Sequence, residues 1–331
     1  MFSNRREKVR ACHGVTRRPS DKLSGQCNSS QTPGVSRTVI VVSLLKEKYG
    51  ISIDEMKAKH AYEDSQFIEL QGMQVHYRDV GSGPVLILLH GMFSSLHTWE
   101  GWIDRLKDDF RVIAVDAPNY GLTGPHPQGM FKHIYSEFLN DFTDALGITE
   151  CMLAGNSLGG WMSWEFAARY PDKVKKIILI DAAGFFFIVP WLLITLAMPG
   201  ATWVSSLIKF PKPAFRSVLK DVYGDPSRLT KDKVNRYYDL MMREGNRSSG
   251  ANVVHFIRNR GGFPTGYLKR ITQPTLVMWG SKDRWIPKRH VPLFKKNIRQ
   301  CDAIIYDGLG HMPMEEMPDK TAEDARQFLL K

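Results

Sequence analysis

The chain has 331 residues, of which 43% are hydrophobic and 24% are charged, and it contains four cysteines. These proportions are typical of a soluble globular protein and exclude a wholly disordered chain, a collagen and a disulfide-stapled miniprotein. The net charge of +11 is unevenly spread, because residues 1–38 carry eight Lys or Arg against two Asp or Glu. The remainder is mildly basic and has no basic motif interleaved with aromatic residues, so we expect no nucleic-acid partner.

Residues 1–60 differ in composition from the rest of the chain. The first 38 are rich in Arg, Ser and Gly and have almost no apolar periodicity, which predicts a basic, disordered extension. The first apolar run, 38–45, is far shorter than the roughly 20 residues that span a bilayer. It is followed by Lys46, Glu47 and Lys48 instead of a small-residue cleavage site. We therefore predict neither a signal peptide nor a transmembrane span. With cysteines in no paired pattern, the cytoplasm is the default expectation.

A regular strand and helix pattern begins at residue 67. Residues 67–70 and 74–77 alternate in polarity and predict a hairpin. Continuous apolar runs, typical of strands buried on both faces, follow at 85–89, 112–115, 151–154, 177–180, 275–279 and 303–306. Helix-length stretches lie between several of them, at 99–108, 135–146 and 158–170. This alternation predicts an α/β fold with a mostly parallel, doubly wound sheet.

The pattern is interrupted once, between residues 184 and 267, where aromatic, Met- and Pro-rich helical segments replace strand-like runs. We predict that 184–267 form an inserted helical cap on a core made of 61–183 and 268–331. The apolar block at the start of the cap is short and contains Pro190, so it does not predict a membrane span. Its residues either pack on the core or line a substrate pocket; the pocket candidates are Trp191, Met198 and Trp203.

One motif indicates a particular chemistry: Gly155-Asn156-Ser157-Leu158-Gly159-Gly160. It directly follows an apolar strand run and opens a helical stretch. In that context Gly-x-Ser-x-Gly forms a sharp, strained turn that exposes the serine hydroxyl. Glycines are needed on both sides because the backbone passes close to itself. Gly-rich turns between a strand and a helix also serve packing or phosphate binding, so the motif alone does not decide the function.

Together with four further motifs, this turn makes residues 66–330 resemble the α/β-hydrolase superfamily, in particular its cap-bearing esterase-like and C–C-hydrolase-like members. The four motifs are His90-Gly91-Met92-Phe93, Asp116-Ala117-Pro118-Asn119-Tyr120-Gly121, the segment 275–283 and the segment 308–313. The resemblance does not cover the first 60 residues. It implies that Ser157 is the nucleophile, Asp283 the acid and His311 the base, in the chain order expected for this fold.

The resemblance also gives each neighbouring group a task. A serine hydroxyl is a poor nucleophile at neutral pH and needs a base, which His311 supplies while Asp283 fixes the tautomer of the imidazole. The tetrahedral oxyanion needs two donors, which are implied to be the backbone N–H groups of Met92 and Leu158. Supporting roles fall to His90, Gly91 and Asp116, and Phe93 and Met312 are further pocket candidates.

The identity of the acid has alternatives. Asp181 also ends an apolar strand, at the place where some relatives carry the acid, and Asp302 and Asp307 lie close to the histidine in sequence. Each could instead serve as a turn or helix-cap carboxylate. We favour Asp283 because its strand and loop match the family pattern.

The leading functional hypothesis is a serine hydrolase that cleaves small-molecule carboxylic esters through an acyl-enzyme and needs no metal or organic cofactor. Epoxide hydrolases and haloalkane dehalogenases of this fold use an aspartate nucleophile, so Ser157 argues against both. The closest alternative is hydrolysis of a C–C bond in a ring-fission diketone, because that family shares the Gly-Asn-Ser-x-Gly-Gly turn. It commonly has Trp where this chain has Met312. A ligand-binding protein on a hydrolase fold is a third possibility, and the oligomeric state is not predicted.

Overall fold

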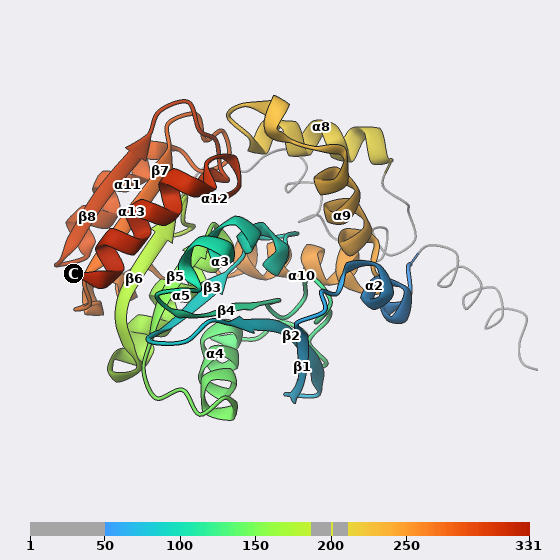
Figure 1. The fold of residues 1–331 in the computed structure, drawn as a ribbon, viewed down its shortest axis with the longest axis horizontal. Coiled ribbons are helices and arrows are strands. Elements are labelled where there is room, and N and C mark those ends of the chain that lie inside the picture. Colours follow the sequence, from blue (N-terminus) through green and yellow to red (C-terminus); the bar gives the residue numbers. More distant parts are fainter. Residues whose placement is uncertain (1–49, 187–199, 201–210) are drawn as a thin grey trace, which may run out of the picture.

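The computed structural model describes residues 50–186, 200 and 211–331 (Figure 1). Eight strands form one sheet in the order β1-β2-β4-β3-β5-β6-β7-β8. Their bounds are β1 (Ser65–Leu70), β2 (Met73–Val80), β3 (Val85–Leu89), β4 (Arg111–Val115), β5 (Cys151–Asn156), β6 (Val174–Ile180), β7 (Thr275–Gly280) and β8 (Cys301–Tyr306). β2 pairs antiparallel with β1 and with β4, and all other pairs are parallel. The predicted mostly parallel sheet is therefore confirmed.

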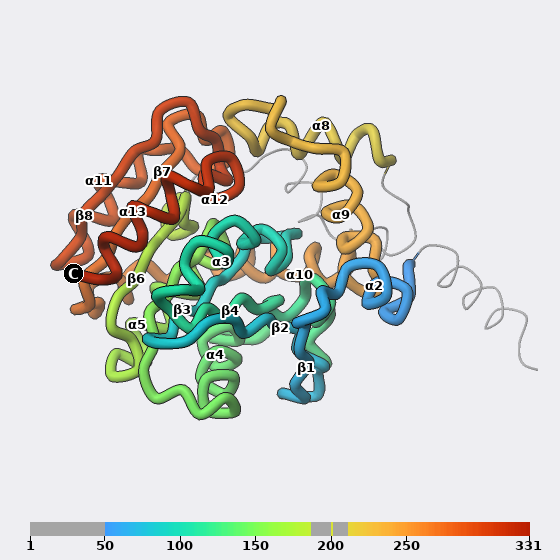
Figure 2. Tube along the Cα trace, viewed as in Figure 1, coloured from blue at the N-terminus to red at the C-terminus, as the bar shows by residue number. Residues whose placement is uncertain are grey.

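Helices cover both faces of the sheet, as Figures 1 and 2 show. They are α3 (Glu100–Leu106), α4 (Ile134–Ala145), α5 (Leu158–Arg169), α11 (Val291–Asn297), the short α12 (Pro313–Glu316) and α13 (Pro318–Leu330). On β3, Ile87 and Leu89 belong to the core under α4, α5 and α11, whereas Leu86 and Leu88 belong to the core under α3 and α13. Both sets are fully buried, which explains why this strand reads as a continuous apolar run.

Between β6 and β7, the described residues contain helices and no strand. These are α8 (Lys212–Val222), α9 (Lys231–Met242), α10 (Asn246–Asn259) and the short 3₁₀ helices η3 (Pro226–Arg228) and η4 (Thr265–Arg270). Phe215 of α8 and Tyr238 of α9 pack in the same core as α3 and α13. Val253 of α10 packs in the core on the other face. Trp191, Met198 and Trp203 lie outside the described residues, so their predicted pocket role stays a prediction.

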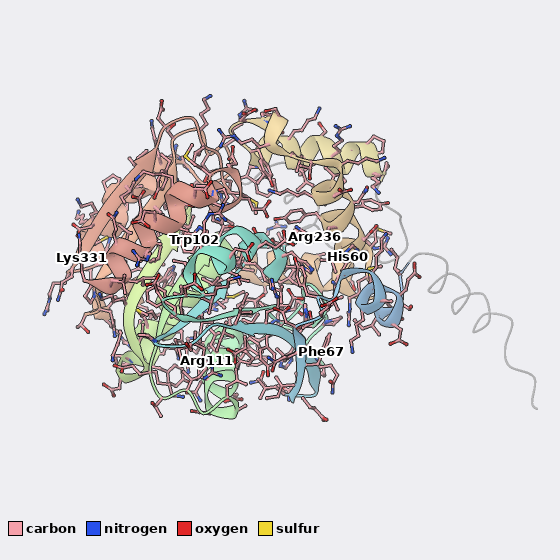
Figure 3. All side chains as sticks on the ribbon, viewed as in Figure 1. His60, Phe67, Trp102, Arg111, Arg236 and Lys331 are labelled. Carbon is pink, nitrogen blue, oxygen red and sulfur yellow. The ribbon has the colours of Figure 1, made fainter. Side chains whose placement is uncertain are left out.

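A helix lies inside the range that the sequence pattern assigned to the N-terminal extension. α2 (Ile53–His60) packs beside α9 (Figures 1 and 2). Met56 is fully buried with Leu122 and Leu240, and His60 Nε2 lies 3.2 Å from a carboxylate oxygen of Asp239 on α9. Figure 3 labels His60 of α2 and, close to it in that view, Arg236 of α9. The sequence pattern was compatible with a short amphipathic segment after residue 38, but a single buried methionine does not set the bounds of a helix.

No helix in the described part of the chain is both long enough and apolar enough to cross a membrane.

Candidate active site

Ser157 occupies the turn between β5 and α5. Its φ of 54° and ψ of −114° lie in a region that non-glycine residues avoid, so the turn is strained. A Cβ added at Gly155 would lie 2.1 Å from the carbonyl oxygen of Gly159, and one added at Gly159 would lie 2.1 Å from that of Leu89. Only glycine fits at either position. Within residues 151–168, Ser157 is the one residue that is not buried, as expected if the turn exposes the serine.

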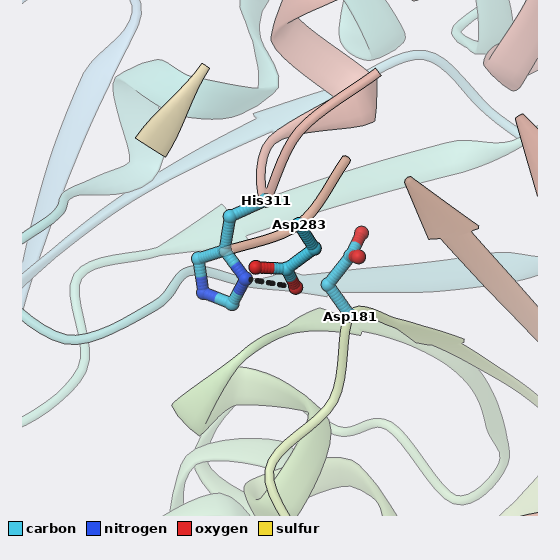
Figure 4. A group of neighbouring side chains, drawn as sticks. All are labelled: Asp181, Asp283 and His311. Carbon is cyan, nitrogen blue, oxygen red and sulfur yellow. Dashed lines mark hydrogen bonds and ion pairs between the residues drawn. The ribbon is translucent and has the colours of Figure 1, made fainter. Parts of the chain in front are cut away.

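Asp283 and His311 form a hydrogen-bonded pair on the loops after β7 and β8 (Figure 4). His311 Nδ1 donates to Asp283 Oδ2 at 2.7 Å. The other carboxylate oxygen accepts from the backbone N–H groups of Trp285 at 2.7 Å and Ile286 at 2.9 Å. These bonds fix the carboxylate, and they place the imidazole proton on Nδ1, which leaves Nε2 free to act as a base. The indole of Trp285 stacks near the imidazole, with ring centroids 6.1 Å apart.

The histidine loop is attached to the serine turn. Asn156, the residue before Ser157, donates its side-chain amide to the carbonyl of His311 at 3.0 Å and to that of Ile180 at 3.2 Å. Ser157 N–H donates to the same Ile180 carbonyl at 2.9 Å. One buried amide therefore holds the segments that carry the predicted nucleophile and the predicted base against one another, and the two catalytic roles stay predictions.

Asp181 lies beside this pair, fully buried at the end of β6. One oxygen of Asp181, one of Asp283 and one ring nitrogen of His311 all lie within 4.8 Å of one another. Burial, and then the nearby Asp283 carboxyl, raise the pKa of Asp181 well above its ordinary value. The other two alternatives lie elsewhere: Asp302 is exposed and Asp307 accepts from Ser281 Oγ at 2.9 Å.

Asp181, Asp283 and His311 are also the group in the described residues whose spacing could suit a metal ion. Two of these residues already bind each other, because His311 Nδ1 donates to Asp283 Oδ2 at 2.7 Å. The donor set therefore matches an acid–base pair better than a metal centre, in which each ligand atom faces the ion.

The loop after β3 lies against the serine turn. His90 is fully buried, accepts from Ala117 N–H at Nε2 (3.0 Å) and donates from Nδ1 to the Gly91 carbonyl (2.7 Å). Burial lowers the pKa of His90, so the ring stays neutral and can accept at Nε2. A Cβ on Gly91 would lie 3.1 Å from that of Ser157. These bonds fix the His90 ring between two backbone segments, and the supporting roles of His90 and Gly91 stay predictions.

The two backbone N–H groups predicted to bind the oxyanion belong to neighbouring segments. Met92 directly follows Gly91 in the loop that lies against the serine turn. Leu158 is the first residue of α5, where a backbone N–H has no acceptor in a preceding helical turn. Their role as oxyanion donors stays a prediction.

Asp116 forms a buried polar centre behind this loop. Its carboxylate accepts from the backbone N–H groups of Leu96 and Leu122 and from His76 Nδ1, each at 2.7 Å. Burial alone raises the pKa of Asp116, but His76 and His90 outweigh burial and hold the pKa at about 2. Asp116 thus joins three segments through its carboxylate, and its supporting role in the site stays a prediction. Its partner His76 was missed, because one histidine in an alternating strand carries no motif.

The two other pocket candidates, Phe93 and Met312, lie within the described residues. The ring of Phe93 packs so closely on α10 that a Cβ at Gly250 would lie 2.1 Å from it, and it contacts the ring of Tyr120 edge to face. Met312 is buried, with its sulfur 3.8 Å from the Tyr237 hydroxyl of α9. Both residues adjoin the site, and their contact with a substrate stays a prediction.

Sequence reasoning also missed Glu316, which joins the histidine loop to the segment after α8. One carboxylate oxygen accepts from Gly310 N–H at 2.7 Å and Gly224 N–H at 3.0 Å, and the other from Asp225 N–H at 3.0 Å. His311 N–H donates to the Val222 carbonyl at 2.7 Å. In the sequence, the one sign of this role was an acidic residue five positions after His311, and its burial became visible only in the structure.

Glu315, the preceding residue, has its side chain buried at the same junction. Its carboxylate accepts from the hydroxyls of Tyr223 and Tyr237, and Lys233 Nζ lies 3.1 Å away. Burial raises the pKa of Glu315, but Lys233 and the hydrogen-bond donors around it outweigh burial and lower the pKa overall. The predicted cap and the histidine loop are thus connected through two acidic side chains.

Residues 84–318 match the family described as the alpha/beta hydrolase fold. The chain belongs to this family. It is 27% identical to a 2-hydroxy-6-oxononadienedioate/2-hydroxy-6-oxononatrienedioate hydrolase of Burkholderia vietnamiensis, over 78% of this chain and 92% of that protein. It is 25% identical to human epoxide hydrolase 4, over 76% of this chain and 74% of that one. A bacterial membrane phospholipase A has a similar fold, with a TM-score of 0.68, 24% identity, and coverage of 88% of this chain and 89% of that one.

Proposed function

We propose that this α/β hydrolase is a serine hydrolase that cleaves carboxylic esters by way of an acyl-enzyme. One observation carries the proposal: a partly exposed serine in a strained strand-to-helix turn, tied through Asn156 to a hydrogen-bonded Asp283–His311 pair. Those groups are what acyl transfer requires, namely a nucleophile, a base with its lone pair on Nε2 and a fixed counter-charge.

The reaction follows from these positions. His311 Nε2 removes the proton from Ser157 Oγ as the oxygen attacks the ester carbonyl, and Asp283 stabilises the imidazolium that forms. The backbone N–H groups of Met92 and Leu158 bind the oxyanion of the tetrahedral intermediate. Collapse of the intermediate transfers the proton to the departing alcohol and leaves Ser157 acylated. Water, activated by His311, then releases the acid and the free serine.

The test is turnover of p-nitrophenyl esters with short to medium acyl chains by the wild type and by Ser157→Ala. We expect kcat to fall by roughly 10⁴-fold or more in Ser157→Ala, because loss of a triad nucleophile removes the covalent route. Ser163→Ala is the matched control: this hydroxyl lies on α5, is buried and donates to the Gly159 carbonyl at 2.8 Å. Turnover that survives in Ser157→Ala would refute the nucleophile assignment.

A second candidate is cleavage of a C–C bond in a vinylogous 1,5-diketone produced by ring fission. It is favoured by the Gly-Asn-Ser-x-Gly-Gly turn and by the similarity to the hydrolase of Burkholderia vietnamiensis named above. Against it, Met312 stands where that family commonly has Trp. Running a ring-fission diketone beside the ester panel separates the two: fast diketone cleavage with negligible ester turnover would replace the ester hypothesis. Acylation by the ester without further turnover would instead indicate a ligand-binding protein.

A further inference from the structure

Two carboxyl groups share the buried space behind His311. Asp181 is fully buried at the end of β6, and one of its oxygens lies within 4.8 Å of an Asp283 oxygen (Figure 4). Two carboxylates this close in a buried site repel each other, so that one of them keeps a proton. Which one keeps it depends on the hydrogen bonds that each accepts.

The hydrogen bonds favour charge on Asp283. Asp283 accepts from two backbone N–H groups and from His311 Nδ1. Asp181 accepts only from Gly280 N–H, at 3.0 Å through Oδ1, and Oδ2 has no hydrogen-bond partner in the part of the chain that the structure describes. Donors stabilise the ionised form of a carboxyl group, and Asp283 has three where Asp181 has one.

The other ionisable groups that act on Asp181 also oppose a negative charge there. The Glu316 carboxyl raises the pKa of Asp181 after burial and Asp283. Tyr306 of β8 is paired with Asp324 at 3.0 Å, so its hydroxyl is already used. A proton on Oδ2 would let that atom donate a hydrogen bond, and the Asp283 carboxylate, which has an oxygen within 4.8 Å of an Asp181 oxygen, can accept one.

We propose that Asp181 is a positioning residue held as a neutral carboxylic acid, which donates its proton to the Asp283 carboxylate and thereby holds Asp283 against His311. The role rests on the proposed catalytic triad. It accounts for a buried acid that the hydrolytic steps do not use. It also explains why Asp181 keeps a strained backbone with φ of 44°, because that conformation directs the side chain toward Asp283.

The first test detects the proton and needs no substrate. The infrared difference spectrum of wild type minus Asp181→Asn at neutral pH should contain the carbonyl stretch of a protonated carboxylic acid. Asn is the matched replacement, because its amide can accept from Gly280 and donate toward Asp283, and because Asn tolerates positive φ. A spectrum that shows only a carboxylate band would overturn the proposal.

The second test measures the positioning role. Asp181→Ala should lower kcat for the best substrate roughly 10-fold, as expected for a misplaced catalytic group. Asp181→Asn should restore most of that loss and leave the acidic limb of the kcat/KM profile where it is in the wild type. If Asp181 were charged, removing that charge would shift the limb to lower pH by about one unit. An Asp181→Asn variant as inactive as Asp283→Asn would make Asp181 the acid instead.

The two failures are distinguishable. An acid band in the spectrum together with no Ser157-dependent hydrolysis would refute the proposed function and leave the protonation of Asp181 standing. Ser157-dependent hydrolysis without the band would refute the inference about Asp181 alone.

Discussion

Asp116 and Asp181 occupy equivalent places and have opposite electrostatics. Each follows a central strand, β4 or β6, and each is fully buried. The pKa of Asp116 is lowered to about 2, whereas that of Asp181 is raised well above its ordinary value. Asp116 accepts from two backbone N–H groups and from His76, while Asp181 has one donor and faces Asp283. Burial opposes charge at both positions, so the neighbouring donors and charges decide which aspartate ionises.

The contrast shows how one sheet edge can support two kinds of acid. An ionised Asp116 accepts from Leu96 N–H, in the segment after β3, and from Leu122 N–H, in the loop after β4. It thereby holds both segments in place. A neutral Asp181 adds no second charge beside the Asp283–His311 pair.

The largest effect is expected for Asp116→Asn. A single amide oxygen cannot serve two backbone N–H groups and His76, so the variant leaves buried donors without acceptors. We expect the free energy of unfolding to fall by about 3 kcal/mol, measured by urea denaturation. Asp181→Asn, the matched change at the other strand end, should lose no more than about 1 kcal/mol. Equal losses would show that the two sites do not differ.

The pH dependence of stability should have opposite signs at the two sites. Asp116, with its pKa lowered to about 2, stabilises the fold above pH 3.8, and that contribution is lost as the pH falls towards 2. Asp181 has a raised pKa, so the folded state keeps a proton that the unfolded state releases above pH 3.8, and stability falls as the pH rises. In thermal unfolding from pH 5 to pH 8, the melting temperature of Asp181→Asn should therefore fall less than that of the wild type as the pH rises. A constant difference would contradict this.

A smaller effect is expected for Glu316→Gln. Gln has one carbonyl oxygen for the three N–H groups of Gly224, Asp225 and Gly310, so at least one of these bonds is lost. We expect stability to fall by about 1–2 kcal/mol, with kcat/KM for the best substrate several-fold lower because the histidine loop loses an anchor. Glu323→Gln, an exposed change on α13, is the control. Unchanged kcat/KM in Glu316→Gln would mean that the loop holds His311 without this link.

The amino-acid sequence alone predicted the mostly parallel sheet and the serine turn. A strand that is buried on both faces needs a continuous apolar run. A position at which an added Cβ would lie 2.1 Å from a backbone oxygen needs glycine. Both features can therefore be recognised in a short stretch of sequence. The family resemblance added Asp283 and His311, which the structure joins at 2.7 Å.

The tertiary structure decided what depends on contacts between distant segments. The pairing of His76 with Asp116, the three bonds of Glu316 and the docking of α2 on α9 join residues that lie 40, up to 92 and about 180 positions apart. The state of Asp181 depends in the same way on Asp283, which only the fold brings beside it. Ionisation reflects the donors and charges within a few ångströms, and a linear sequence does not state which groups those are.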